Sequence, residues 1–193
     1  ALVAVRVSDG HGVVVGVWQR PPGVRGVGWT VPVVDVERTI NDTFGTYRVI
    51  GFFADPSHVR DDETLERIWD PVLDRVHRMY RSQLRVWAKK GASGGASHSV
   101  IFDMSILSNQ RQFIDHLKIV TADIQAEAVT IDPDARLRSH LLNSKRVPTR
   151  AGVSIGKEHR ESRKKIDLAV AWVGAHMVRR LYLNTRKRGG WAA

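Results

Sequence analysis

Two aspartates stand where a carboxylate could do chemistry. Asp55 follows a short apolar run, residues 49–54, and is itself followed by Pro56. A run that is apolar on both faces indicates a central strand covered by helices, and ligands of open α/β sheets bind beyond the carboxyl ends of such strands. Pro56 favours an extended Asp55, so the carboxylate is presented at a fixed place. The simpler alternative is an ordinary Asp-Pro turn.

The second acid, Asp167, stands in the first turns of the last predicted helix and borders its apolar stripe. An acid near a helix N-terminus is favoured by the helix dipole, and it could instead pair with a neighbouring cation from 163–165. A carboxylate held there could also bind Mg²⁺ or Mn²⁺, which prefer oxygen ligands. Together, Asp55 and Asp167 predict hydrolysis of a phosphodiester by two metal ions, with their carboxylates about 4 to 9 Å apart.

The positive charge of the chain is concentrated in its last third. The whole chain has a net charge of +10, and residues 136–193 contain 15 Lys and Arg but only three acids. A one-sided basic field favours a polyanionic partner, nucleic acid before anionic membrane, with solubility as the simpler explanation. We expect a continuous DNA-binding surface beside the two aspartates, built from Arg136, Arg138, Lys145, Arg146, Arg150, Lys157, Arg163 and Lys164.

The first half of the chain must position Asp55. β-Branched runs at 1–7 and 13–18 flank an Asp-Gly turn and predict a hairpin, in which Asp9 and His11 serve only the turn. A helix is expected from Thr30 to about Gly45, with the central strand directly after it. Apolar residues at helical spacing between 65 and 87 predict a helical region that is broken or kinked at Asp70-Pro71, with Asp70 capping its second segment.

The second half must position Asp167. We expect a flexible connection at 91–97, a strand at 99–104 ending near Asp103, and a helix at 109–127. A short helix capped at Asp132 should follow, then an irregular basic stretch, 144–161, and a helix capped by Ser162. The expected domain therefore covers residues 1–183, and 184–193 form a basic flexible tail.

Composition bounds the function classes. With 193 residues, of which 42% are hydrophobic, the chain can form one domain with a core. It has no cysteine, which excludes a disulfide framework, a thiolate metal site and a cysteine nucleophile. No apolar run approaches the length of a membrane span, so no membrane partner is expected. The chain opens directly on the first predicted strand, and we expect it to be a fragment cut at its N-terminus.

Several short motifs occur in an order that resembles a known family. They are Ala1–Val5, Gly16-Val-Trp18, Trp29–Pro32, Phe53–Pro56, Leu137-x-x-His140-x-x-Asn143 and Arg163–Ala171. The ordered set, which spans residues 1 to about 180, looks like the C-terminal nuclease domain of the terminase large subunit of tailed bacteriophages. The resemblance implies an α/β, RNase H-like mixed sheet flanked by helices. It also implies a two-metal endonuclease that cuts concatemeric double-stranded DNA.

By resemblance, Asp55 and Asp167 are catalytic metal ligands, and His140, Asn143 and Lys157 are supporting residues. The family's first catalytic strand, with its own aspartate, precedes the segment that begins here at Ala1. We therefore expect the first strand to be missing and this fragment to be inactive alone. Within the chain, Asp103 is the best substitute for the third acid, although a strand-end acid is more often a cap or turn residue.

The resemblance also implies partners and a location: double-stranded DNA, an upstream ATPase domain, the portal, the small terminase subunit and the host cytoplasm. Two alternatives stay open. One is another RNase H-like nuclease of the resolvase or integrase type. The other is a non-catalytic basic module that binds nucleic acid or docks a partner, which would have no need of Asp55 close to Asp167.

Overall fold

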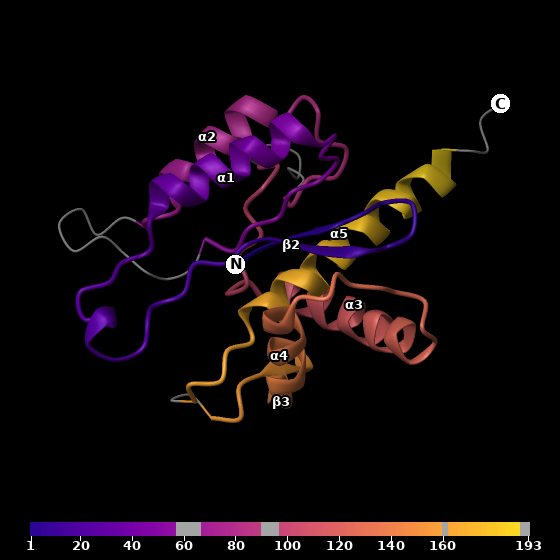
Figure 1. Cartoon of the computed structure of the whole chain (residues 1–193). Helices are drawn as coiled ribbons and strands as arrows, with labels where there is room; N and C mark the ends of the chain where they lie inside the picture. Colours follow the sequence, from indigo (N-terminus) through magenta and orange to yellow (C-terminus); the bar gives the residue numbers. More distant parts are fainter. Residues whose placement is uncertain (57–66, 90–96, 160–161, 190–193) are drawn as a thin grey trace.

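The computed structural model describes residues 1–56, 67–89, 97–159 and 162–189, the last four of these without their side chains. Within this part of the chain the fold is mixed α/β (Figure 1), with two antiparallel two-stranded sheets, five α-helices and one 3₁₀ helix. The α/β class expected from the sequence is confirmed at this level.

The N-terminal hairpin is confirmed. β1 (Leu2–Val5) pairs antiparallel with β2 (Gly12–Gly16), and the Asp9 carboxylate closes the turn by accepting from the His11 N–H at 3.0 Å. Gly12 also forms a parallel bridge to Ile131, so β2 has a second neighbour. A Cβ at Gly12 would lie 2.3 Å from Trp172 Nε1, so only glycine allows the strand to approach that indole.

The 3₁₀ helix (Gly23–Gly26) leads to α1 (Val33–Thr46), which starts after Pro32. Its buried residues, Val36, Ile40 and Phe44, form the apolar face expected from the sequence. The helix continues one residue past Gly45, where a Cβ would meet no other atom.

The predicted central strand is an extended segment that pairs through single bridges. Gly51 bridges Val86 and Ala54 bridges Ile101, both in parallel. The Ala54 N–H donates to the Val100 carbonyl and the Phe102 N–H donates to the Ala54 carbonyl, each at 2.8 Å. The segments that end at Asp55 and at Asp103 are therefore neighbours, and they run parallel.

Of the helical region expected after this strand, only residues 70–80 are helical among the described residues, because 67–69 precede α2 and 81–87 do not continue it. α2 (Asp70–Tyr80) ends at Tyr80, and Val86 beyond it bridges Gly51 instead of continuing the helix. Apolar periodicity could not separate these cases, because a buried extended segment and a buried helix need the same residue types. Asp70 is the first helical residue and its side chain caps nothing, contrary to expectation. The start of the expected helical region, up to residue 66, and residues 91–96 of the expected flexible connection lie outside the described part of the chain.

α3 (Leu107–Gln125) and α4 (Ala135–Asn143) match the two expected helices with shifted ends. The cap of α4 is Asp134, whose carboxylate accepts from the N–H groups of Arg136 and Leu137, so the assignment of Asp132 was wrong. The expected irregular stretch after α4 was also wrong, because β3 (Lys145–Thr149) and β4 (Gly152–Gly156) form a hairpin.

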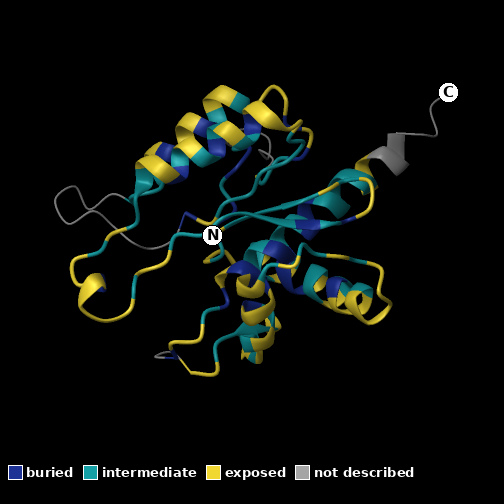
Figure 2. Cartoon of the chain, viewed as in Figure 1, coloured by how far each residue is buried: buried dark blue, intermediate teal, exposed yellow. Residues whose placement is uncertain are grey.

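The last helix, α5 (Asp167–Gly189), runs through the middle of the molecule (Figures 1 and 2). Its buried residues include Leu168, Trp172, Val173 and Met177. Ser162 does not cap it, since its hydroxyl accepts from the Lys164 N–H before the helix begins. The helix includes residues 184–189 of the expected tail, while 190–193 lie outside the described part.

Two hydrophobic clusters hold these elements. One joins α1 and α2 to residues around Leu84 and Val100, and the other joins α3 and α4 to Leu168, Trp172 and Val173 of α5. Leu2 packs against the first cluster and Val3 and Val5 against the second, so β1 links them. No helix among the described residues is long and apolar enough to cross a membrane.

His176 of α5 generates a prediction about pH. It is 1% exposed and lies edge-on to Trp172, and burial, reinforced by Arg179 and Arg180 and opposed by Asp123, lowers its pKa to about 4. A group with a lowered folded pKa stabilises the fold fully above its unfolded pKa, about 6.5 for histidine, and this contribution is lost as pH falls toward 4. We expect His176→Leu to remove up to about 3 kcal/mol of acid destabilisation.

The measurement is urea unfolding of parent and variant between pH 8 and about 4.5. The difference between the two should change with pH in favour of the variant, whereas His159→Gln, at an exposed position, should follow the parent. A parent–variant difference that is constant over this range would contradict the prediction.

Candidate metal and nucleic-acid site

Asp55 lies exposed at the end of the central segment, followed by the fully buried Pro56. Its Oδ1 accepts from the backbone N–H of Met104 at 3.3 Å. The carboxylate is therefore tied to the neighbouring segment just beyond the end of both strands.

Asp103 lies beside it and is 8% exposed. Burial acts to raise its pKa, but hydrogen bonds from the Ser105 hydroxyl and N–H and from Arg67 outweigh it, so the pKa is lowered. The Ser105 N–H lies 2.8 Å from Oδ1, and Arg67 Nη1 lies 2.9 Å from Oδ2. Asp103 thus has the contacts of a turn residue, which was the simpler alternative to a metal ligand.

Asp167 is the first residue of α5 and is exposed. The negative charge of its carboxylate acts to raise the pKa of two groups, the His140 imidazole and the Ala1 amino group. Desolvation lowers the pKa of the Ala1 amino group, while the Asp167 carboxylate acts to raise it. Because Ala1 precedes β1, the beginning of the N-terminal hairpin lies close to the beginning of α5.

His140 and Asn143 of α4 hold the start of α5 in place. His140 Nδ1 accepts from the Leu168 N–H at 3.0 Å, and Asn143 Nδ2 donates to the Lys165 carbonyl at 3.1 Å. The first N–H groups of a helix have no partner within it, so the imidazole replaces an ordinary cap. Burial lowers the pKa of His140, with Asp167 opposing, which favours the neutral ring that this acceptor role requires.

Asp55 and Asp167 are each one residue contact away from the second hydrophobic cluster. The residue that bonds to Asp55, Met104, packs against the cluster that contains Leu168, the neighbour of Asp167. The separation of the two carboxylates, expected at about 4 to 9 Å, stays a prediction. Among the described residues, no three Asp, Glu, His or Cys side chains form a group that could hold a metal ion.

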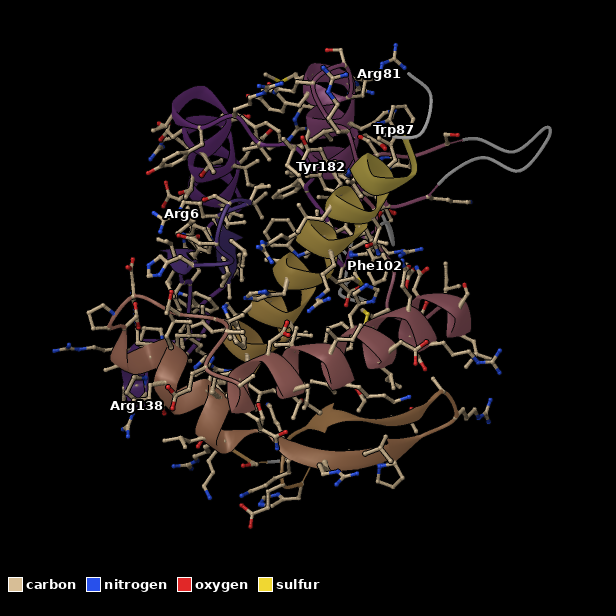
Figure 3. All side chains as sticks on the ribbon, turned by 90° about the vertical axis from the view of Figure 1, so that its right-hand side faces the viewer. Arg6, Arg81, Trp87, Phe102, Arg138 and Tyr182 are labelled. Atoms are coloured by element: carbon tan, nitrogen blue, oxygen red, sulfur yellow. The ribbon has the colours of Figure 1, made fainter. Side chains whose placement is uncertain are left out.

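The basic residues predicted to bind DNA divide into two kinds. Arg136 is held by Asp134 and Lys164 by Glu158, at 2.6 and 3.1 Å. Lys145, Arg146 and Arg150, on and beside β3, are exposed and form no ion pair with a described residue. Figure 3 shows Arg138 on α4 at the outer edge of the molecule. Arg163 is exposed as well, and Lys157, just after β4, is half-buried.

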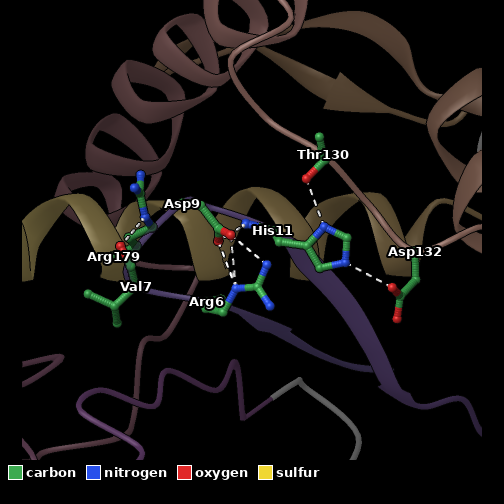
Figure 4. A network of polar contacts seen from close by, with 7 residues as sticks. All are labelled: Arg6, Val7, Asp9, His11, Thr130, Asp132 and Arg179. Carbon is green, nitrogen blue, oxygen red and sulfur yellow. Dashed lines mark hydrogen bonds and ion pairs between the residues drawn. The ribbon is translucent and has the colours of Figure 1, made fainter.

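A polar network at the hairpin turn is structural (Figure 4). Arg6 forms an ion pair with Asp9, and His11 contacts Thr130 Oγ1 at 2.7 Å and Asp132 Oδ1 at 2.8 Å. Arg179 donates to the Val7 carbonyl at 2.9 Å, which ties the turn to the C-terminal half of α5. Asp9 therefore lies at the end of β1 that is remote from Asp167, as expected.

Sequence reasoning missed Arg67, which lies close to Asp55, Asp70 and Asp103. The only available signal was an arginine three residues before the Asp-Pro pair at 70–71, and that spacing is common on helices. The pairing of Arg67 with Asp103 is a long-range contact that no local pattern reports.

The anchoring of α5 by His140 gives a second prediction. His140→Ala should lower the free energy of unfolding by about 2 to 4 kcal/mol, because it leaves a cavity and an unpaired buried N–H. Leu142→Ala on the same helix, at a side chain that is 65% exposed, should change it by less than about 0.5 kcal/mol. Urea unfolding at pH 7.5 measures both, and equal small losses would show that His140 does not anchor α5.

Comparisons with known proteins find relatives in bacteriophages. The chain is 32% identical over 189 residues to the Gene 13 protein of Mycobacterium phage L5 and 33% identical over 189 residues to the Gene 13 protein of Mycobacterium phage D29. Each match covers 97% of this chain, but the chain spans only 28% of the length of each relative. No family model and no solved structure matches. The chain is thus similar to one part of two longer phage proteins.

Proposed function

We propose that this chain is the metal-dependent endonuclease domain of a bacteriophage terminase large subunit, cutting concatemeric double-stranded DNA during genome packaging. The observation that carries the proposal is the meeting of β1, α4 and α5 at Asp167. There an exposed carboxylate stands at a helix start that is anchored by His140 and Asn143. The similarity to two longer phage proteins supports only the bacteriophage part of this proposal.

In this proposal, Asp55 and Asp167 are two of the ligands for a pair of Mg²⁺ or Mn²⁺ ions. One ion activates a water molecule for attack on the phosphorus, and the pair stabilises the departing oxygen. The described residues do not supply a third carboxylate, since Asp103 is engaged by Ser105 and Arg67. In this proposal the third ligand belongs to a strand of an RNase H-like sheet in the longer protein, before the segment that begins at Ala1, as the resemblance to terminases implies.

The β3–β4 hairpin is the element best suited to hold the DNA backbone. Its three cations, Lys145, Arg146 and Arg150, are exposed, and only Lys145 lies in the field of a described acid, Glu158. Val147 packs over Gly156 within the hairpin, and Gly152 lies against Ile114 of α3, so the cations stand on a supported element. Phosphate contacts of this kind give affinity without sequence preference.

A non-catalytic DNA-binding module is the second candidate. It is favoured by the absence, among the described residues, of a three-ligand metal group. It needs the basic hairpin and does not need Asp55 or Asp167, so substitutions at the two acids distinguish the candidates. If the terminase proposal holds, the working partners are DNA, the ATPase domain, the portal and the small terminase subunit, in the host cytoplasm.

The nuclease prediction concerns the longer protein that includes the residues preceding Ala1. We expect it to nick plasmid DNA with Mn²⁺ or Mg²⁺, and Asp55→Ala or Asp167→Ala to lower the rate at least about 100-fold, because a metal-pair site loses a ligand. The 193-residue chain alone should cleave poorly, since two carboxylates hold Mg²⁺ weakly.

The matched control is Asp115→Ala, which removes an exposed acid paired only with Lys118 on α3. It should cut as fast as the parent, and all three variants should bind DNA with similar affinity. If Asp167→Ala retains full activity, Asp167 serves only the start of the helix and the proposed mechanism is wrong.

A further prediction concerns salt. Converting Lys145, Arg146 and Arg150 together to Gln should weaken binding to a short duplex and reduce the slope of log affinity against log salt by about one for each phosphate that is no longer neutralised. The control converts Arg78, Arg81 and Arg85, which are exposed on and after α2, and thus makes the same change in charge. Fluorescence anisotropy between about 50 and 200 mM salt measures both. Equal slopes in the two triple variants would contradict the assignment.

A further inference from the structure

The carboxyl end of the central segment holds a cation of its own. Arg67 donates from Nη1 to Asp103 Oδ2 at 2.9 Å, and its Nε lies 3.6 Å from Asp70 Oδ2. The negative field that raises the pKa of Arg67 comes from Asp103, Asp70 and Asp55. The guanidinium therefore contacts two acids, Asp103 and Asp70, and lies in the field of a third, Asp55.

The positive charge of Arg67 offsets the repulsion between the carboxylates of Asp55 and Asp103. Asp55 and Asp103 follow directly on residues of two parallel segments that are joined through Ala54, so two negative charges stand at one edge. Like charges placed close together raise one another's energy, and a buried carboxylate such as Asp103 needs a partner. Arginine suits this place because its planar group bonds to one acid while lying beside others.

The same contact determines where Asp55 points. Asp55 is tied to the Met104 N–H, and Met104 follows Asp103 in the chain. The turn at Asp103 is fixed by Ser105 and Arg67, and the Asn109 side chain donates to the Asp103 carbonyl at 2.9 Å. Arg67 is thus one contact away from the segment that holds Asp55.

We propose that Arg67 is a positioning residue, which holds the Asp103 and Asp70 carboxylates together beside Asp55 and sets, through its positive charge, how tightly Asp55 binds a divalent cation. The metal part of this inference rests on the proposed function, whereas the ion-pair part does not. A fixed positive charge near a cation site weakens cation binding. Arg67 therefore lowers the affinity of Asp55 for a divalent cation, while it holds the Asp103 and Asp70 carboxylates in place.

The first experiment is a double-mutant cycle on the thermal midpoint of the chain, with Arg67→Gln, Asp103→Asn and both together. Arg67→Gln should lower the midpoint by about 4 to 8 °C in the parent and by less than half as much when Asp103→Asn is present. The control is Arg75→Gln, which breaks the exposed pair with Glu37 and should act independently of Asp103→Asn. Additive effects of Arg67→Gln and Asp103→Asn would overturn the ion-pair part.

The second experiment measures Mn²⁺ binding to the same proteins by water-proton relaxation, with Arg67→Lys added. Arg67→Gln should tighten Mn²⁺ binding at least about threefold, because the opposing charge is removed from a partly exposed site. Arg67→Lys and Arg75→Gln should both bind like the parent. An unchanged or weaker affinity in Arg67→Gln would overturn the electrostatic part. Coupling in the cycle without Mn²⁺ binding in any protein would count against the proposed metal site and leave the ion-pair role of Arg67 supported.

Discussion

The anchoring of the start of α5 is the constraint on which the rest of the structure depends. α5 carries Leu168, Trp172, Val173 and Met177 into the core, so its first turn lies where main-chain groups need partners. The ring of His140 supplies an acceptor from another helix. Because α4 is fixed to α5 in this way, the β3–β4 hairpin that follows α4 is also held close to the start of α5.

The same constraint organises the charges of the protein. The carboxylate of Asp167 stands at the start of α5, while Asp55 stands at the end of a segment that Met104 connects to the same hydrophobic cluster. The exposed cations of the hairpin lie on a separate element. The acids that we propose as metal ligands and the cations that we propose to bind phosphate therefore lie on different elements, so one set can be substituted without the other.

Local patterns predicted the elements whose signals are local. The N-terminal hairpin, the apolar faces of α1 and α5, and the neighbouring segments at Ala54 and Ile101 follow from turn residues and periodicity. The errors occur where a distant contact decides. Val86 is extended because it bridges Gly51, Asp132 binds His11 instead of capping a helix, and the hairpin after α4 packs on α3. The ion pair between Arg67 and Asp103 could not be predicted from the sequence for the same reason, since the two residues are distant in the chain.

The close approach of Gly12 to Trp172 determines the position of the hairpin along α5 as well as the contact itself. If β2 slid by one residue along α5, Val13 would bring a side chain to the place that the indole leaves open only for glycine. The hairpin therefore has only one allowed register against α5. Gly12 fixes that register at the indole of Trp172, and the pairing of β2 with β1 then fixes where β1 begins. The register of the hairpin against α5 is therefore determined by a single glycine on β2.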